Sequence, residues 1–240
     1  MFLKNKKGIY QFEELKKFPF LIHGISSRNL GNCGLEKEAR KKFIKLLDGE
    51  EKSLILAEQV HGSKIKVVKE KDKGKIISGV DGLITQEWNL ILGVRTADCL
   101  PLLYFEPERK IIGVAHAGWR GVLKRLPQKM VDQIIRLGGI PQNILVAIGP
   151  HICQKCYSVD KNRIDQFINE FGKIKGMVLE EKYLNLFLPT KIQLIHSGIW
   201  EKNIFSSGMC TSCNYQEFFS YRKDNQKDYG EILSIIGLKV

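Results

Sequence analysis

The most informative segment of the sequence is Gly93-Val-Arg-Thr-Ala-Asp-Cys-Leu-Pro-Leu-Leu-Tyr-Phe105, followed after five residues by Ile111-Ile-Gly-Val-Ala-His-Ala-Gly-Trp-Arg-Gly121. Two apolar runs, each with the composition of a buried strand, flank a short charged segment that contains Pro107. This pattern predicts an antiparallel β-hairpin in which Pro107 takes the second position of a type I turn.

The hairpin predicts that a thiol and an imidazole lie close together. A loop centred between Pro107 and Glu108 places Cys99 directly opposite His116. Directly opposed residues have Cβ atoms about 4.5–5.5 Å apart, within reach of a shared metal ion or a hydrogen bond. A bulge or an odd-length loop would turn the two side chains to opposite faces. The alternative for both residues is an ordinary core position, a small buried cysteine and a hydrogen-bonded histidine.

A third candidate is His61, which follows a predicted strand in Glu58-Gln-Val-His-Gly62. One thiolate and two imidazoles form a ligand set that suits zinc or copper. Three protein ligands leave a tetrahedral zinc ion one position for water, which is the catalytic arrangement. No local spacing connects His61 to the hairpin, so the shared site is a hypothesis at this point.

The rest of the chain mixes predicted strands with amphipathic helices. Apolar residues four apart predict a helix over residues 35–47, and Pro127 is expected to begin a fresh helix as its first residue within Arg120–Leu137. The other expected helices are Asp160–Phe171 and Thr190–Trp200, and the expected strands are Ser53–Val60, Ile65–Lys69, Gly82–Thr85, Leu90–Arg95, Leu100–Phe105, Ile111–Ala115, Ile144–Ile148 and Glu231–Leu238. Strands in antiparallel pairs, with helices between groups of them, predict an α+β fold with mixed, largely antiparallel sheets.

Composition excludes several classes of protein. The 240 residues are 43% hydrophobic and 27% charged, as in ordinary globular proteins, and no linker divides them, so we expect one domain over residues 1–240. No apolar run reaches about 18 residues, and the first residues contain no secretory signal pattern. We therefore expect a cytoplasmic protein with no membrane partner, whose six cysteines are free thiols, metal ligands or nucleophiles.

The net charge of +12 comes from lysines that are scattered along the chain. No basic cluster is interleaved with aromatic residues as a stacking platform for bases would be, so we expect no nucleic-acid partner. A solvated lysine-rich surface explains the charge, and an anionic small molecule is the next explanation. A basic nucleic-acid-binding protein is the non-enzyme alternative.

Several segments resemble, in order, the signatures of the YfiH-like family. They are Gln59-Val-His-Gly62, Val80-Asp-Gly-Leu-Ile-Thr85, Gly93–Pro101, Ala115-His-Ala-Gly-Trp-Arg-Gly121, Ile148-Gly-Pro150, Tyr157-Ser-Val159, Cys210-Thr211 and Phe218-Phe-Ser-Tyr-Arg222. The family has been described as a laccase-type multicopper polyphenol oxidoreductase and as a purine nucleoside phosphorylase, and peptidoglycan-precursor editing has been associated with it. The matches extend over nearly the whole chain.

The resemblance implies a layered α/β/β/α fold and a zinc ion, with copper as the alternative, held by His61, Cys99 and His116. It implies phosphorolysis of adenosine, inosine and methylthioadenosine to free base and ribose 1-phosphate, together with deamination of adenosine. The expected partners are thus a purine nucleoside and phosphate, and the expected assembly is a monomer or homodimer.

Further residues are candidates for the chemistry. Asp98, beside the thiol, is a candidate proton carrier. Arginine forks bind phosphate bidentately, and four arginines in or beside matched motifs are candidate substrate ligands. These are Arg28, Arg40, Arg120 and Arg222.

Departures from the family pattern bear on substrate choice. Ser26-Ser-Arg28 continues directly into Asn29-Leu-Gly31 without the family's glycine- and serine-rich loop. The family's Asn-Arg is Ala39-Arg40 here, and its Thr-Gly-Arg is Asp228-Tyr-Gly-Glu231.

Three rival enzyme classes remain open, a metal-free hydrolase, a peptidoglycan-precursor editing enzyme and a laccase-type oxidase. In a metal-free hydrolase, Cys99 would be the nucleophile and His116 its base, and His61 would be dispensable. A laccase-type oxidase generally uses several coppers, and five histidines spread along the chain offer few ligands for them.

Two Cys-x-x-Cys pairs form a second motif, Cys153-Gln-Lys-Cys156 and Cys210-Thr-Ser-Cys213. Their spacing resembles a four-cysteine zinc site, but the stretch between the pairs far exceeds the about 15–20 residues of a compact zinc ribbon. We therefore expect two unrelated thiol pairs, with a second metal site and an oxidative disulfide as the alternatives.

Overall fold

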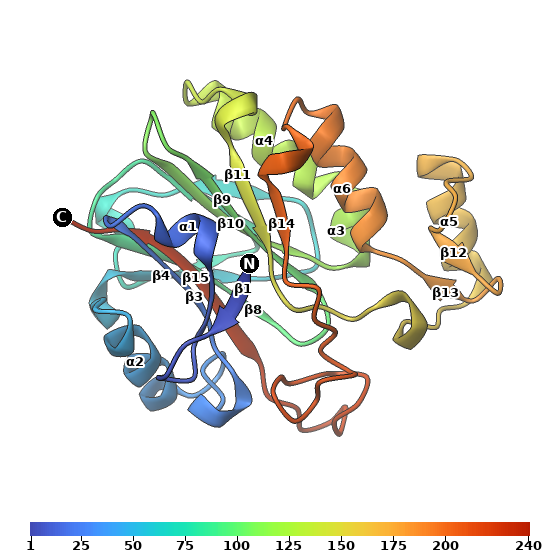
Figure 1. The fold of residues 1–240 in the computed structure, drawn as a ribbon, viewed down its shortest axis with the longest axis horizontal. Helices are drawn as coiled ribbons and strands as arrows, with labels where there is room; N and C mark the ends of the chain where they lie inside the picture. The colour runs from blue at the N-terminus through green and yellow to red at the C-terminus, as the bar shows by residue number, and fades with distance from the viewer.

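The computed structural model describes residues 1–240 and contains two mixed sheets stacked face to face (Figure 1). In spatial order, the seven-stranded sheet consists of β1 (Phe2–Lys4), β2 (Tyr10–Phe12), β3 (Leu21–Ile25), β15 (Ile232–Leu238), β8 (Leu90–Thr96), β4 (Leu54–Glu58) and β6 (Ile76–Ser78). The six-stranded sheet consists of β14 (Ile204–Ser206), β11 (Leu145–Ile148), β9 (Leu100–Glu106), β10 (Ile111–Ala117), β7 (Gly82–Thr85) and β5 (Ile65–Val67). Most pairs are antiparallel, but β4–β6, β4–β8, β5–β7 and β11–β14 are parallel.

The two sheets share one apolar layer. Leu92 and Val94 of β8 belong to the same buried cluster as Leu103 of β9 and Val114 of β10. Burial on both faces explains why these strands read as continuous apolar runs rather than as alternating ones. The central strands therefore form a fixed frame for the residues at their ends.

Helices cover the outer face of each sheet, which completes the expected α/β/β/α layering (Figure 1). On the seven-stranded sheet, α2 (Lys37–Leu46) buries Phe43 and Ile44. Four helices contribute to the core on the other side: α3 (Trp119–Leu123), α4 (Leu126–Arg136), α5 (Lys161–Phe171) and α6 (Phe187–His196). The short α1 (Glu13–Lys16) and the hairpin of β12 (Val178–Leu179) with β13 (Tyr183–Leu184) complete the structure, in which no helix has the length and apolarity to span a membrane.

Two local predictions need correction. Pro127 is the second residue of α4 rather than the first, because Arg125, in the left-handed region at φ 58°, is the N-cap. The register of the hairpin was also wrong, since Ile111 pairs with Glu106 and His116 lies opposite Pro101. A four-residue loop replaces the tighter turn because Lys110 adopts φ 56° and the Glu106 carboxylate accepts the N–H of Arg109 at 2.6 Å. The shift is an even number of residues, so both side chains still project from one face.

Candidate metal centre

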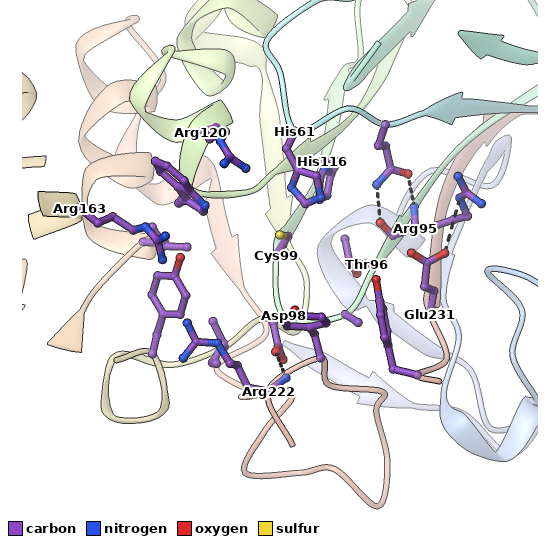
Figure 2. Close-up of a pocket in the computed structure, with 18 residues that line it drawn as sticks. His61, Arg95, Thr96, Asp98, Cys99, His116, Arg120, Arg163, Arg222 and Glu231 are labelled. Carbon is purple, nitrogen blue, oxygen red and sulfur yellow. Dashed lines mark hydrogen bonds and ion pairs between the residues drawn. The ribbon is translucent and has the colours of Figure 1, made fainter. Parts of the chain in front are cut away.

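Three donors from separate segments converge at one end of the sheet sandwich (Figure 2). His61 follows β4, Cys99 directly precedes β9, and His116 lies on β10. Their ligand atoms all lie within 4.8 Å of one another, and the two imidazole centroids are 4.7 Å apart at an interplanar angle of 75°. The structure thus brings together the three residues on which the metal hypothesis depends.

The backbone around these donors has little freedom. His61 and Asp98 both adopt positive φ, 53° and 88°, which orients the segments on either side of the centre. A Cβ atom at Gly118 would lie 2.9 Å from His61 Nδ1 and 3.0 Å from Cys99 Sγ. Glycine is therefore required at position 118 for the donors to approach one another.

A buried carboxylate, Asp81, supports the centre from behind. Its Oδ1 lies 2.8 Å from His116 Nδ1, and its Oδ2 accepts the backbone N–H groups of Gly62 at 2.6 Å and Val60 at 3.3 Å. Burial opposes ionisation of Asp81, but the hydrogen bonds from His116 and Gly62 outweigh it and hold the pKa of the carboxyl below its usual value. Because Nδ1 of His116 donates to Asp81, Nε2 is left free to bind a metal.

The thiol and the imidazole stabilise each other's charge. Burial is the largest single effect on each group and favours its neutral form. The attraction and hydrogen bond between the pair, together with the contacts of His61 to the thiol and of Asp81 to the imidazole, outweigh burial. They lower the pKa of Cys99 to about 6 and raise the pKa of His116 to about 9. The thiolate is the form of cysteine that binds metals, and a Cys-His-His set with a carboxylate behind one histidine fits a zinc ion.

The donors lie in a cavity of about 500 Å³ that 18 residues line. Four of these residues are arginines, Arg95, Arg120, Arg163 and Arg222, against two acids, Asp98 and Glu231. Figure 2 shows Arg120, Arg163 and Arg222 on one side of Cys99, and Arg95 with Glu231 on the other. The cavity is therefore electropositive, and its most basic side is distinct from the side that contains Glu231.

Aromatic rings hold the guanidinium groups on the basic side. The Cζ atoms of Arg120 and Arg163 lie 4.4 and 4.3 Å from the centroid of the Trp119 ring, and Arg222 lies over Tyr157 at 5.0 Å. Nε of Arg163 is buried with no hydrogen-bond partner. Sequence reasoning missed Arg163, which comes from α5 and has no motif around it, although Trp119 belongs to the matched His-Ala-Gly-Trp segment.

The opposite side of the cavity is organised around β8. The Gln59 side-chain amide donates to the carbonyl of Arg95 at 2.6 Å and accepts its N–H at 2.8 Å. Nε of Arg95 lies 3.7 Å from Oε2 of Glu231, and both atoms are buried without a hydrogen-bond partner. Burial raises the pKa of Glu231. These two side chains therefore retain hydrogen-bonding capacity for a ligand.

Asp98 lines the cavity, and both of its carboxylate oxygens accept hydrogen bonds. The Thr211 hydroxyl donates to its Oδ1 at 2.6 Å, and the N–H of Arg222 donates to its Oδ2 at 2.8 Å. The backbone carbonyl of Asp98 accepts the N–H of Ile152 at 2.9 Å. This geometry suits a positioning residue that fastens two neighbouring loops to the centre.

Two predicted substrate ligands do not line the cavity. Arg28 pairs with Asp224 at 2.7 Å and stacks on Phe219 with its Cζ 4.2 Å from the ring centroid. Arg40 donates to the carbonyl of Gly34 at 3.2 Å. Arg28 thus fastens its segment to residues 215–224, and Arg40 contacts the chain just before its own helix, whereas Arg120 and Arg222 do line the cavity.

Comparisons with known proteins agree with this architecture. The family model described as multi-copper polyphenol oxidoreductase laccase matches residues 35–239. "Purine nucleoside phosphorylase YlmD" of Bacillus subtilis is 32% identical over 254 residues, covering 91% of this chain and 89% of that protein. "Adenosine deaminase RL5" of an unknown prokaryotic organism is 29% identical and covers 71% of this chain and 70% of its own. The crystal structure of the hypothetical protein YfiH of Bacillus licheniformis has a TM-score of 0.90 at 31% identity and covers 99% of both chains.

Proposed function

This chain belongs to the family described as multi-copper polyphenol oxidoreductase laccase. Within this family, we propose that it is a zinc-dependent purine nucleoside phosphorylase. The reaction would split a purine nucleoside with phosphate into free base and ribose 1-phosphate, with deamination of adenosine as a side activity. The relatives named for both activities support this assignment. The observation that carries it is the convergence of His61, Cys99 and His116 inside a cavity lined by four arginines.

His61, Cys99 and His116 would hold the zinc ion. Zinc with three protein ligands supplies a Lewis acid and a means of activating water near neutral pH. Asp81 keeps the His116 ring in place and fixes its tautomer through the 2.8 Å contact to Nδ1. This centre offers the donors of one ion, which favours zinc over a site for several coppers.

The basic side of the cavity would bind phosphate. Arg120, Arg163 and Arg222 approach it from three directions (Figure 2), and guanidinium forks match phosphate oxygens. Because Arg120 and Arg163 already stack on Trp119, they lose little rotamer freedom on binding. Fixed cations next to the centre would hold the anionic nucleophile where the glycosidic bond breaks.

The other side of the cavity would receive the base. Tyr221 and Tyr229 line it, with ring centroids 5.1 Å apart in an edge-to-face arrangement, and offer aromatic surface. The Glu231 carboxyl and the Arg95 guanidinium carry the buried polar atoms without partners there. A purine edge presents both donors and acceptors, so it can satisfy both groups.

One observation favours a second candidate, a metal-free cysteine hydrolase. Asp81, His116 and Cys99 form a chain of contacts like the orienting acid, base and nucleophile of such enzymes. The lowered pKa of Cys99 suits a nucleophile as well as a metal ligand. His61 is a required ligand in the metal centre, whereas in a hydrolase it would only add to the stronger contact that His116 makes with Cys99, and this difference separates the two candidates.

Product analysis tests the proposal. Zinc-loaded protein is incubated with adenosine, with and without phosphate, and the products are separated by chromatography. We expect adenine and ribose 1-phosphate only when phosphate is present, and inosine in smaller amount. Protein that forms neither adenine nor inosine would contradict the assignment.

His61→Ala distinguishes the mechanisms. If the zinc hypothesis holds, this variant loses bound metal at the centre and at least 100-fold in turnover. A cysteine hydrolase would retain its activity. His196→Ala is the matched control, because His196 is an exposed residue at the end of α6.

A further inference from the structure

A second group of donors lies outside the cavity. The Sγ atoms of Cys153, Cys156, Cys210 and Cys213 all lie within 4.8 Å of one another. The expectation of two unrelated thiol pairs was therefore wrong. The two cysteine pairs come together because β11 and β14 are adjacent parallel strands, and the two cysteine segments leave these strands side by side. A further bridge between His151 and Cys210 continues this pairing to the first cysteine of the second pair.

We propose that these four cysteines form a structural tetrathiolate zinc site. With zinc–sulfur bonds of about 2.3 Å, the sulfur atoms of a tetrahedral site lie about 3.8 Å apart. Here Cys213 Sγ lies 3.5 Å from Cys156 Sγ and 4.0 Å from Cys153 Sγ. Both distances are close to that tetrahedral spacing, the other sulfur pairs lie within 4.8 Å, and all four are free cysteines.

Two backbone N–H groups contact the sulfur of the most buried member of the cluster. The N–H groups of Cys153 and Cys213 point at Cys210 Sγ, at 3.2 and 3.4 Å. Such contacts hold a ligand sulfur in a fixed orientation. Cys213 is exposed and the first pair is half-buried, so an ion can enter from solvent.

The donor set selects the ion. The group contains four sulfurs and no carboxylate or imidazole, which excludes the hard cations magnesium and calcium. Four protein ligands fill a tetrahedral zinc ion and leave no position for water, so the site is structural rather than catalytic. Binding releases the thiol protons to solvent and involves no redox change.

The four cysteines lie on two segments that also contribute residues to the cavity. The loop with Cys153 and Cys156 also carries Ile152 and Tyr157 of the cavity, and the segment after Cys210 carries Thr211 and Arg222. Both segments meet Asp98, through the N–H of Ile152, the Thr211 hydroxyl and the N–H of Arg222. An ion on the four thiols would clamp together the two loops that form this wall of the cavity.

Zinc stoichiometry, measured by elemental analysis after gel filtration of zinc-loaded protein, tests the site. We expect Cys99→Ser to retain one zinc per chain and Cys156→Ser/Cys213→Ser to bind one fewer than the wild type. Cys33→Ser is the matched control, because Cys33 is a buried free cysteine outside both clusters. Iron in place of zinc, or equal zinc content in the wild type and the double variant, would overturn the proposal.

A second measurement does not depend on how the double variant folds. Cys99→Ser keeps all four thiols of the cluster, and one equivalent of cobalt should produce sulfur-to-cobalt charge-transfer bands and the visible bands of tetrahedral cobalt. Absence of these bands would also overturn the site. Both tests read metal content and not turnover, so failure of the phosphorylase assignment would leave their outcome unchanged.

Discussion

At the scale of single residues, Asp81 shows why sequence identifies metal ligands more readily than their supports. His61, Cys99 and His116 stand out by residue type and by the resemblance of their motifs. A carboxylate behind a histidine has no such signal until strand pairing is known. Ala115 of β10 pairs with Gly82 of β7, and the N–H of His116 donates to the Asp81 carbonyl at 2.8 Å. That register alone places the carboxylate beside the ring.

Asp81→Asn should weaken the centre while preserving its volume. The amide cannot provide the negative charge that stabilises a donating His116 Nδ1, and it accepts more weakly from the turn at Gly62. We expect zinc affinity at this centre to fall by about 10- to 100-fold, as is usual when such a partner is lost. Competition with a chelating dye measures it. Asp165→Asn, on an exposed position of α5, is the control and should bind zinc as the wild type does. If Asp81→Asn also bound zinc with the wild-type affinity, the role of Asp81 would be contradicted.

At the scale of elements, strands with an unbroken apolar run were predictable, and a strand whose apolar run is broken was not. Strand β7 matches its expected limits, and β8, β9 and β10 differ from theirs by one or two residues. The segment Leu21–Ile25 was missed because His23 and Gly24 interrupt its apolar pattern, although it is buried between β2 and β15. The turn of the central hairpin was missed because a left-handed Lys110 carries no signal in the residue type.

Gly118→Ala tests how closely the hairpin brings the donors together. The backbone at Gly118 has φ −72°, which any residue adopts, so the fold should tolerate alanine. The added Cβ would however lie within 3.0 Å of both His61 Nδ1 and Cys99 Sγ. We expect at least a 10-fold loss of zinc affinity at this centre, with little change in the Tm of the metal-free protein. Unchanged affinity would show that the donors stand further apart in solution.

At the scale of the whole molecule, neighbouring strands bring together residues that lie far apart in the sequence. The layered fold was foreseeable from the order of strands and helices and from the family resemblance. The cysteine cluster was not, because it depends on β11 and β14 lying parallel across the intervening α5 and α6. Arg163 likewise reaches the cavity from α5, distant in the sequence from Trp119, on which it stacks. Contacts between segments so far apart in the chain follow from tertiary packing and not from local pattern.

The stability of the whole molecule should depend on pH through His23, which lies in β3 with 1% of its surface exposed. Its Nε2 accepts the N–H of Phe12 at 3.0 Å, and its Nδ1 has no partner. Burial, reinforced by Lys16 and opposed by Glu13 and Glu14, lowers the pKa of His23 to about 4. The histidine in the unfolded chain has an ordinary pKa of about 6.5, so between these two pKa values it binds a proton that the folded chain does not bind.

The neutral, buried His23 makes its full contribution to the free energy of unfolding above pH 6.5, and this contribution is lost as the pH falls toward 4. Linkage with these pKa values gives a loss of about 2 kcal/mol in the free energy of unfolding between pH 7.5 and pH 5. His23→Gln should remove that part of the slope, because an amide oxygen can accept the Phe12 N–H and does not titrate. Urea unfolding with chelator present, so that metal release does not contribute, measures both slopes. His196→Gln should keep the wild-type slope, and identical slopes for His23→Gln and the wild type would show that another group controls acid unfolding.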